Sequence, residues 1–217
     1  MPITGAGSRV GHHPVLGRRG VYDRRAVVTP RTIRSADCRV MPWKNGQGST
    51  TEIAVEPPGA ALDGFAWRIS VAELRVSGPF STFPGYDRVI VQLDGPPMSL
   101  AHGGAAPVRL DPLVPHAFSG DDETACAVAG VAHDFNLMVR RDLATAALVV
   151  RRLSGGEAIE LAADVATVVY VLEGALELRD GDRLDPGDAS AEKAGEGVMC
   201  RSAGTAVALV ATLRPRW

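Results

Sequence analysis

The segment that decides the fold runs from Val165 to Asp188 and reads VATVVYVLEGALELRDGDRLDPGD. It opens with the most hydrophobic stretch of the chain, which predicts a buried strand over 165–173. Gly174 turns the chain, and Asp180-Gly181-Asp182 is a hairpin signal of the Asp-Gly type. Asp185-Pro186-Gly187-Asp188 forms one more turn. The segment therefore predicts short strands joined by tight turns.

Similar β-rich runs continue through the chain from about residue 31. The clearest lie at 65–72, 88–93 and 135–141, whereas 142–150 fits either a helix or a strand. Many strands at a spacing of 8–12 residues predict a sandwich or a barrel. The glycine turns and the Pro-Gly-Asp motif of 172–188 resemble the core of a cupin, which is a small jelly-roll barrel. We therefore expect an all-β bicupin with two jelly-roll barrels.

Charge and composition divide the chain of 217 residues into a basic start and an acidic body. Residues 1–34 hold seven arginines and one acid, and the remainder holds 24 acidic against 16 basic residues. We expect residues 1–30 to be a disordered or misassigned basic extension, 31–145 the first barrel and 146–217 the second. An acidic body argues against nucleic acid as a partner. No apolar run approaches 18 residues, so no membrane span is expected.

The cysteines and histidines predict neither disulfides nor a metal centre. Three scattered cysteines are too few for a disulfide framework or a zinc site, and they indicate reduced thiols in a cytoplasmic protein. The five histidines form no His-x-His pair, and none lies in the second barrel. His102, His116 and His133 could converge in the first barrel, but no spacing argues for it. We therefore expect no metal and no cofactor.

The segment from Phe65 to Ala72 carries the strongest signal for a binding site. Its alternation puts Trp67 and Ile69 on one face and Arg68 and Ser70 on the other. If the second face lines a barrel, a guanidinium and a hydroxyl point together into a cavity. Arginine binds a carboxylate through two parallel, charge-assisted hydrogen bonds. The alternative interpretation of Arg68 is a solvated strand residue.

Four further residues are candidates for binding a ligand. Trp43, Lys44 and Asn45 belong to a Pro-Trp-Lys-Asn-Gly segment, whose glycine suggests tight backbone geometry near a ligand or a turn. Arg88 follows a Pro-Gly turn. The alternatives are core packing for Trp43, a solvated loop position for Lys44, and an ion pair of Arg88 with Asp87 or another acid.

Several long motifs in the same order resemble the HutD/Ves family, which is associated with histidine utilisation. The matching segments are 41–50, 67–72, 78–81, 83–88 and 134–141, and residues 1–30 lie outside the resemblance. The resemblance implies a bicupin without a metal, a cytoplasmic location, a homodimer and a regulatory role through a small carboxylate intermediate. It also carries over Lys44, Asn45, Arg68 and Ser70 as pocket residues. Gln47 departs from the family pattern.

Three functions follow as alternatives. The favoured one is a non-catalytic binding protein that senses a small anionic metabolite, such as urocanate, formiminoglutamate, formylglutamate or formate. The second is a metal-independent enzyme acting on a small acid, with Lys44, His116 or Asp134 transferring protons. The third is a protein-interaction module. Asp134 and Asn136, at alternate positions, fit either ligand groups or a turn cap, and the cap is favoured.

Overall fold

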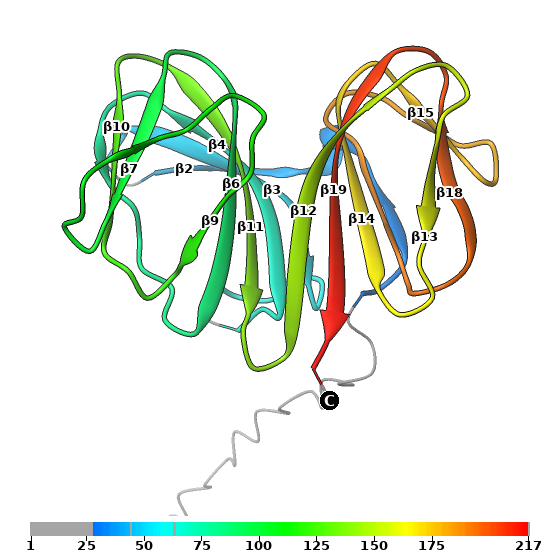
Figure 1. The fold of residues 1–217 in the computed structure, drawn as a ribbon, viewed down its shortest axis with the longest axis horizontal. Helices are drawn as coiled ribbons and strands as arrows, with labels where there is room; N and C mark the ends of the chain where they lie inside the picture. The colour runs from blue at the N-terminus through cyan, green and yellow to red at the C-terminus, as the bar shows by residue number, and fades with distance from the viewer. Residues whose placement is uncertain (1–27, 44, 63, 217) are drawn as a thin grey trace, which may run out of the picture.

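The computed structural model describes residues 28–43, 45–62 and 64–216. Over these residues the chain is built from β-strands in four antiparallel sheets, with one short 3₁₀ turn, η1 (Ser35–Asp37). Figure 1 shows two lobes side by side, joined along the middle of the molecule. The prediction of an all-β fold with two jelly-roll barrels is confirmed. Within the described ranges no helix is long and apolar enough to cross a membrane.

The first barrel consists of two sheets. The inner N-terminal sheet has the strand order β2 (Arg39–Pro42), β3 (Gly48–Glu56), β4 (Trp67–Leu74), β11 (Ala132–Arg140), β6 (Tyr86–Asp94) and β9 (His116–Ser119). The outer N-terminal sheet has the order β5 (Gly78–Pro79), β10 (Thr124–Val128), β7 (Met98–His102) and β8 (Val108–Arg109).

The second barrel repeats this arrangement. The inner C-terminal sheet has the order β1 (Arg31–Ile33), β17 (Ala189–Glu192), β14 (Ala166–Glu173), β19 (Ala206–Pro215) and β12 (Ala144–Leu153). The outer C-terminal sheet has the order β13 (Ala158–Leu161), β18 (Gly197–Ser202), β15 (Leu176–Leu178) and β16 (Arg183–Leu184). The segment that fits either a helix or a strand by sequence is therefore mostly strand β12.

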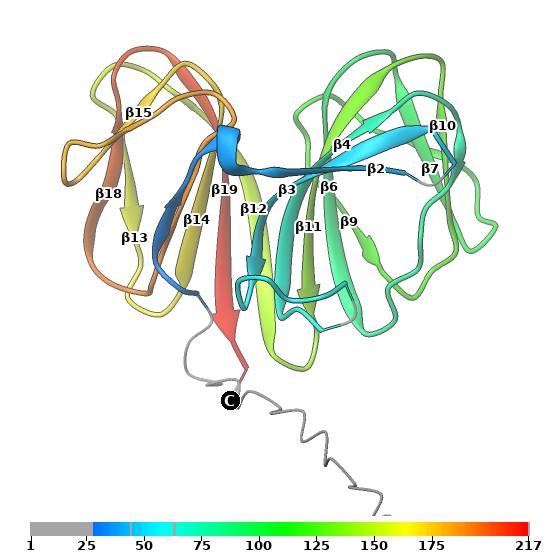
Figure 2. The ribbon, with the colours of Figure 1, turned by 180° about the vertical axis from the view of Figure 1, so that it is seen from behind.

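The first described strand, β1, lies in the second barrel, and the chain crosses from it to the first. β1 pairs with β17, so Arg31–Ile33 belong to the second barrel, and not to the first barrel that is predicted over 31–145. Arg34 fastens the segment there, with Nη1 donating to Asp188 Oδ2 at 3.0 Å and Nη2 to the carboxylate of Asp182. The chain then runs across the molecule to β2 in the other lobe (Figure 2). Most of the predicted extension, residues 1–27, lies outside the described residues.

The largest apolar core lies between the two inner sheets. Trp67 and Phe135 reach it from the first barrel, and Tyr170 and Leu209 from the second. Each strand also has an inward face, since successive side chains point to opposite sides of a sheet. In the second barrel that interior is filled by apolar side chains around Leu176. In the first barrel, apolar clusters around Leu100 and around Phe65 fill only part of the interior, and the cavity described below lies beside them.

Gly174 makes the turn after β14 that the sequence predicts, and the chain packs closely against it there. Its φ is +73°, and a Cβ there would lie 2.2 Å from the backbone oxygen of Thr205. At Gly181, φ is +86° but nothing lies within 4 Å of the position that a Cβ would take, so an alanine there meets only backbone strain. We expect Gly174→Ala to lower the free energy of unfolding by about 1–3 kcal/mol more than Gly181→Ala. Urea denaturation of both variants measures the difference, and equal losses would contradict the tight packing at this turn.

Candidate ligand-binding site

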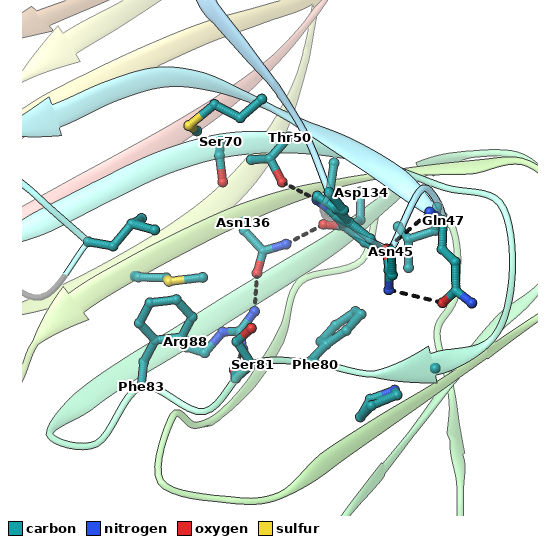
Figure 3. Close-up of a pocket in the computed structure, with 18 of the residues that line it drawn as sticks. Asn45, Gln47, Thr50, Ser70, Phe80, Ser81, Phe83, Arg88, Asp134 and Asn136 are labelled. Atoms are coloured by element: carbon teal, nitrogen blue, oxygen red, sulfur yellow. Dashed lines mark hydrogen bonds between the residues drawn. The ribbon is translucent and has the colours of Figure 1, made fainter.

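A cavity of about 510 Å³ lies in the first barrel, on the inward face of the inner N-terminal sheet. Its lining combines apolar side chains, including Trp43, Phe80 and Met138, with polar groups. The buried polar side chains of β4, β6 and β11 that line the cavity are Arg68, Ser70, Arg88, Asp134 and Asn136. Figure 3 shows Asn136 between Arg88 and Asp134.

The strand register explains why these residues meet. Met138 of β11 pairs with Arg68 of β4 on one side and with Arg88 of β6 on the other. The two arginines therefore start from backbones two strand spacings apart, about 10 Å. Two residues further along the same pair of strands, Asn136 of β11 pairs with Ser70 of β4. Alternate residues of a strand share one face of the sheet. The two arginines, Ser70 and Asn136 therefore point into the cavity, whereas residues next to them in sequence, such as Ile69 and Leu137, pack between the barrels.

Arg68 points into the cavity, and Glu52 and Ser70 hold its guanidinium group by hydrogen bonds. It is 5% exposed, its Nε donates to Glu52 Oε2 at 2.8 Å, and its Nη1 donates to Ser70 Oγ at 3.4 Å. The pairing of β3 with β4 shifts register between Glu52 and Ala54. The interpretation of Arg68 as a solvated strand residue is wrong, and the structure places it beside Ser70 in the cavity. The binding roles of both residues stay predictions.

Arg88 lies in an aromatic cage formed by Phe80, Phe83 and Phe118. The guanidinium carbon lies 4.7 Å from the centre of the Phe118 ring, and 5.5 and 5.6 Å from those of Phe80 and Phe83. Aromatic faces attract a desolvated cation. Nη2 donates to Asn136 Oδ1 at 2.9 Å, whereas the buried Nε has no hydrogen-bond partner among the residues described.

The ion pair with Asp87, considered as an alternative for Arg88, does not form. Asp87 instead accepts a hydrogen bond from Arg141 Nε at 2.7 Å. Burial lowers the pKa of Arg88 to about 10, Asp134 opposes this shift, and the charge of Arg68 adds to it. Arg88 is still protonated at neutral pH. Two buried guanidinium groups thus line one cavity, and Arg88 has no carboxylate hydrogen-bonded to it in the described structure.

Asp134 and Asn136 lie within β11, so their interpretation as a turn cap is wrong. Asn136 Nδ2 donates to Asp134 Oδ1, and Asp134 Oδ2 has no partner among the described residues. Asp134 is fully buried, and burial raises the pKa of its carboxyl to about 7, although Arg88 and Asn136 act in the opposite direction. The alternation of Phe135 and Leu137 with these two polar residues is the sequence signal that places them on the inward face.

Pro42, Trp43 and Asn45 of the Pro-Trp-Lys-Asn-Gly segment line the cavity. Trp43 Nε1 donates to Thr50 Oγ1 at 2.8 Å, and its ring packs against Gly48, where a Cβ would lie 3.1 Å from the ring atoms. Asn45 lines the cavity but is exposed, and its Oδ1 accepts a hydrogen bond from the backbone N–H of Gln47 at 3.0 Å. Lys44, predicted as a ligand contact, lies outside the described residues.

Comparison with known proteins places the chain in a family. The model of the HutD family matches residues 35–210. The chain belongs to the HutD family. It is 46% identical over 107 residues to the "Uncharacterized 21.2 kDa protein in hutC 3'region" of Pseudomonas putida, a match covering 49% of this chain and only 56% of that protein. It is 37% identical over 151 residues to Protein Ves of Cronobacter sakazakii, covering 66% of this chain and 78% of that protein.

Solved structures agree with this assignment. HutD from Pseudomonas fluorescens SBW25, whose structure is described as a formate condition, has a TM-score of 0.72 and 33% identity over 87% of this chain and all of that one. Lactobacillus farciminis oxalate decarboxylase has a TM-score of 0.65 at 7% identity over 88% of each chain. The second likeness shows the cupin-type fold alone.

The histidines of this HutD-family chain partly converge. His102 and His116 come from β7 and β9, and their Nε2 atoms lie 3.0 Å apart, a contact that no sequence spacing indicated. Neither lines the cavity, and His133 lies elsewhere, with its Nδ1 2.7 Å from Asp94 Oδ1. No group of three or more His, Cys, Asp or Glu side chains that could hold a metal ion occurs among the described residues.

Proposed function

We propose that this protein is a non-catalytic binding protein that senses a small carboxylate-bearing metabolite in its first barrel. The observation that carries the proposal is the pair of buried guanidinium groups of Arg68 and Arg88 in one cavity. Arg68 is partly neutralised by Glu52, but Arg88 is held by an amide, a backbone carbonyl and aromatic rings. A carboxylate entering the cavity supplies the missing countercharge and accepts hydrogen bonds from the guanidinium groups.

The size and lining of the cavity suit a small organic acid. A volume of about 510 Å³ lies within the usual range of small-molecule sites, and aromatic side chains beside the arginines can cover the body of such a ligand. Family membership makes intermediates of histidine degradation the first candidates: urocanate, formiminoglutamate and formylglutamate. Formate joins them because the P. fluorescens structure is described as a formate condition.

The proposal extends to the setting of the protein. We place it in the cytoplasm, since its three cysteines are free and such thiols suit a reducing compartment. The homodimer and the regulatory role in histidine utilisation follow from the family resemblance. Light scattering of the purified protein tests the dimer directly.

Arg88→Met is expected to remove ligand binding. Millimolar urocanate, formiminoglutamate, formylglutamate or formate should raise the melting temperature of the wild type, because a ligand that binds only the folded state stabilises it. Loss of a buried charge that pairs with a ligand costs about 2–5 kcal/mol, so the affinity should fall at least about 30-fold. Differential scanning fluorimetry measures the shift. Arg141→Met, at an exposed ion pair outside the cavity lining, is the matched control and should keep it.

Two outcomes would contradict the proposal. If none of the four acids shifts the melting temperature of well-folded wild-type protein, a carboxylate-sensing function is wrong. If Arg88→Met binds as tightly as the wild type, the arginine pair is not the binding site.

A second candidate, a metal-independent enzyme acting on a small acid, is favoured by one observation. Asp134 lies in the cavity, and burial raises the pKa of its carboxyl to about 7, which suits a group that gives and takes protons at neutral pH. Turnover of any of the four acids, followed by NMR and abolished in Asp134→Asn, would support this activity. Unchanged substrate spectra after prolonged incubation with the wild type would exclude it for these acids.

A further inference from the structure

Asp134 is the acidic end of a cavity whose other polar end is basic. Its Oδ1 is already bound by Asn136, while Oδ2 is fully buried and has no hydrogen-bond partner in the part of the chain that is described. A buried polar atom without a partner is rare in native proteins and calls for an explanation. The side chain is one of those that line the cavity, so a bound molecule would lie beside it.

The neighbours of Asp134 cannot supply the missing donor. Its partner on β4 is Ala72, which has no polar side chain, and its partner on β6 is Gln92. Both ends of the Gln92 amide are committed elsewhere, with Nε2 donating to the Pro96 carbonyl at 2.8 Å and Oε1 accepting from the Met98 N–H at 3.2 Å. The strand pairing thus leaves Asp134 Oδ2 without a donor from either neighbouring strand.

Two charged side chains and one amide act on this carboxyl, together with its burial. Arg88 and His133 favour its ionised form through their charges, and Asn136 does so through its hydrogen bond, but burial outweighs them. The thiol of Cys126, from β10 on the outer sheet, is itself kept protonated, because burial and the charge of Asp134 raise its pKa to about 12. No described group donates to Oδ2.

We propose that Asp134 is a specificity-determining residue, which selects ligands that carry an N–H donor in addition to the carboxylate held by the arginines. This inference rests on the proposed carboxylate-binding function. Asn136 joins the two ends of the site, because it accepts from Arg88 and donates to Asp134. A molecule with a carboxylate at one end and an N–H a few bonds away can therefore span from the guanidinium groups to Oδ2.

The chemistry separates two classes of ligand. An ionised carboxylate only accepts hydrogen bonds, so an N–H satisfies it. A ligand without a donor leaves Oδ2 unpaired or requires Asp134 to hold a proton. A site built around a polar contact discriminates against the analogue that lacks it. Binding of an N–H ligand should also release a proton near pH 7, because the new hydrogen bond favours the ionised form.

The test compares two probes, trans-urocanate and trans-3-(2-furyl)acrylate, by isothermal titration calorimetry at pH 7. They share the acrylate, but the furan ring has no N–H. We expect the wild type to bind urocanate about 10- to 100-fold more tightly. Titrations in phosphate and in Tris should reveal proton release with urocanate and none with furylacrylate. Asp134→Leu should bind both probes equally, whereas the exposed control Asp94→Asn should keep the discrimination.

The results distinguish this inference from the function beneath it. Equal affinity of the wild type for both probes, or tighter binding of furylacrylate, overturns the role of Asp134 while carboxylate binding stands. Absence of proton release with urocanate overturns it as well. If neither probe binds, and no other small carboxylate does, the proposed function fails and this inference fails with it. The wild-type measurements decide the matter even if Asp134→Leu does not fold.

Discussion

Asp134→Asn is expected to stabilise the ligand-free protein by about 2–4 kcal/mol at pH 8. Burial raises the pKa of Asp134 to about 7 in the folded state, whereas an unfolded chain has a value of about 3.9. The folded state therefore binds more protons than the unfolded state between these values, so stability falls as the pH rises from about 4 to about 7. Each pKa unit corresponds to about 1.4 kcal/mol. An asparagine has no charge to bury and avoids this loss.

Urea denaturation at pH 5 and pH 8 measures the effect. The advantage of Asp134→Asn over the wild type should shrink to about 1–2 kcal/mol at pH 5, because much of the titration has not yet occurred there. Asp111→Asn changes an exposed carboxylate outside the cavity and should show no such pH-dependent difference. A variant that is less stable than the wild type at pH 8 would mean that Asp134 is satisfied in the folded protein by a group outside the described residues.

Burying charged and polar groups lowers the stability of the first barrel, a cost that the second barrel avoids. The second barrel fills its interior with apolar side chains, while the first keeps two arginines, an acid and an amide in the same place. Buried polar groups are costly unless each has a partner. Two atoms without partners among the described residues, Arg88 Nε and Asp134 Oδ2, belong to side chains that line the cavity. A ligand that pairs both ends of the cavity would relieve this cost, so binding and stability should be coupled.

The parts of this site that the sequence predicts are those set by local geometry. Two-residue periodicity over 65–72 places Arg68 and Ser70 on one face, and that face is inward. Glycine and proline turns likewise predict strand ends, because they depend on a few neighbouring residues. The jelly-roll architecture follows from many such turns taken together.

Long-range pairing accounts for the features that sequence patterns do not reveal. Phe80, Phe83 and Phe118 meet around Arg88 only because β6 and β9 pair and loops from elsewhere close over them. β1 joins the second barrel through a three-residue strand, too short for a recognisable period. The turn-cap interpretation of Asp134 is wrong because strand β11 begins earlier, at Ala132, than the apolar alternation suggests.

Trp67→Ala is expected to cause the largest loss of stability, about 3–5 kcal/mol. Trp67 is fully buried between the two inner sheets, so its removal opens a cavity in the core that joins the barrels. Because residues of both barrels pack in this core, they should unfold in a single transition whose melting temperature falls by roughly 6–20 °C. Scanning calorimetry measures the shift. Val149→Ala, at a half-exposed position of β12, should change stability by less than about 0.5 kcal/mol.

The same variant connects the core to the site. Trp67 and Arg68 are consecutive in β4 and point to opposite faces, so the tryptophan fixes the strand that presents the guanidinium. Trp67→Ala should therefore weaken urocanate binding at temperatures where the variant is still folded. A stability loss below about 1 kcal/mol, well under the range for a buried tryptophan, or two separate transitions in the wild type, would show that the barrels do not share one core.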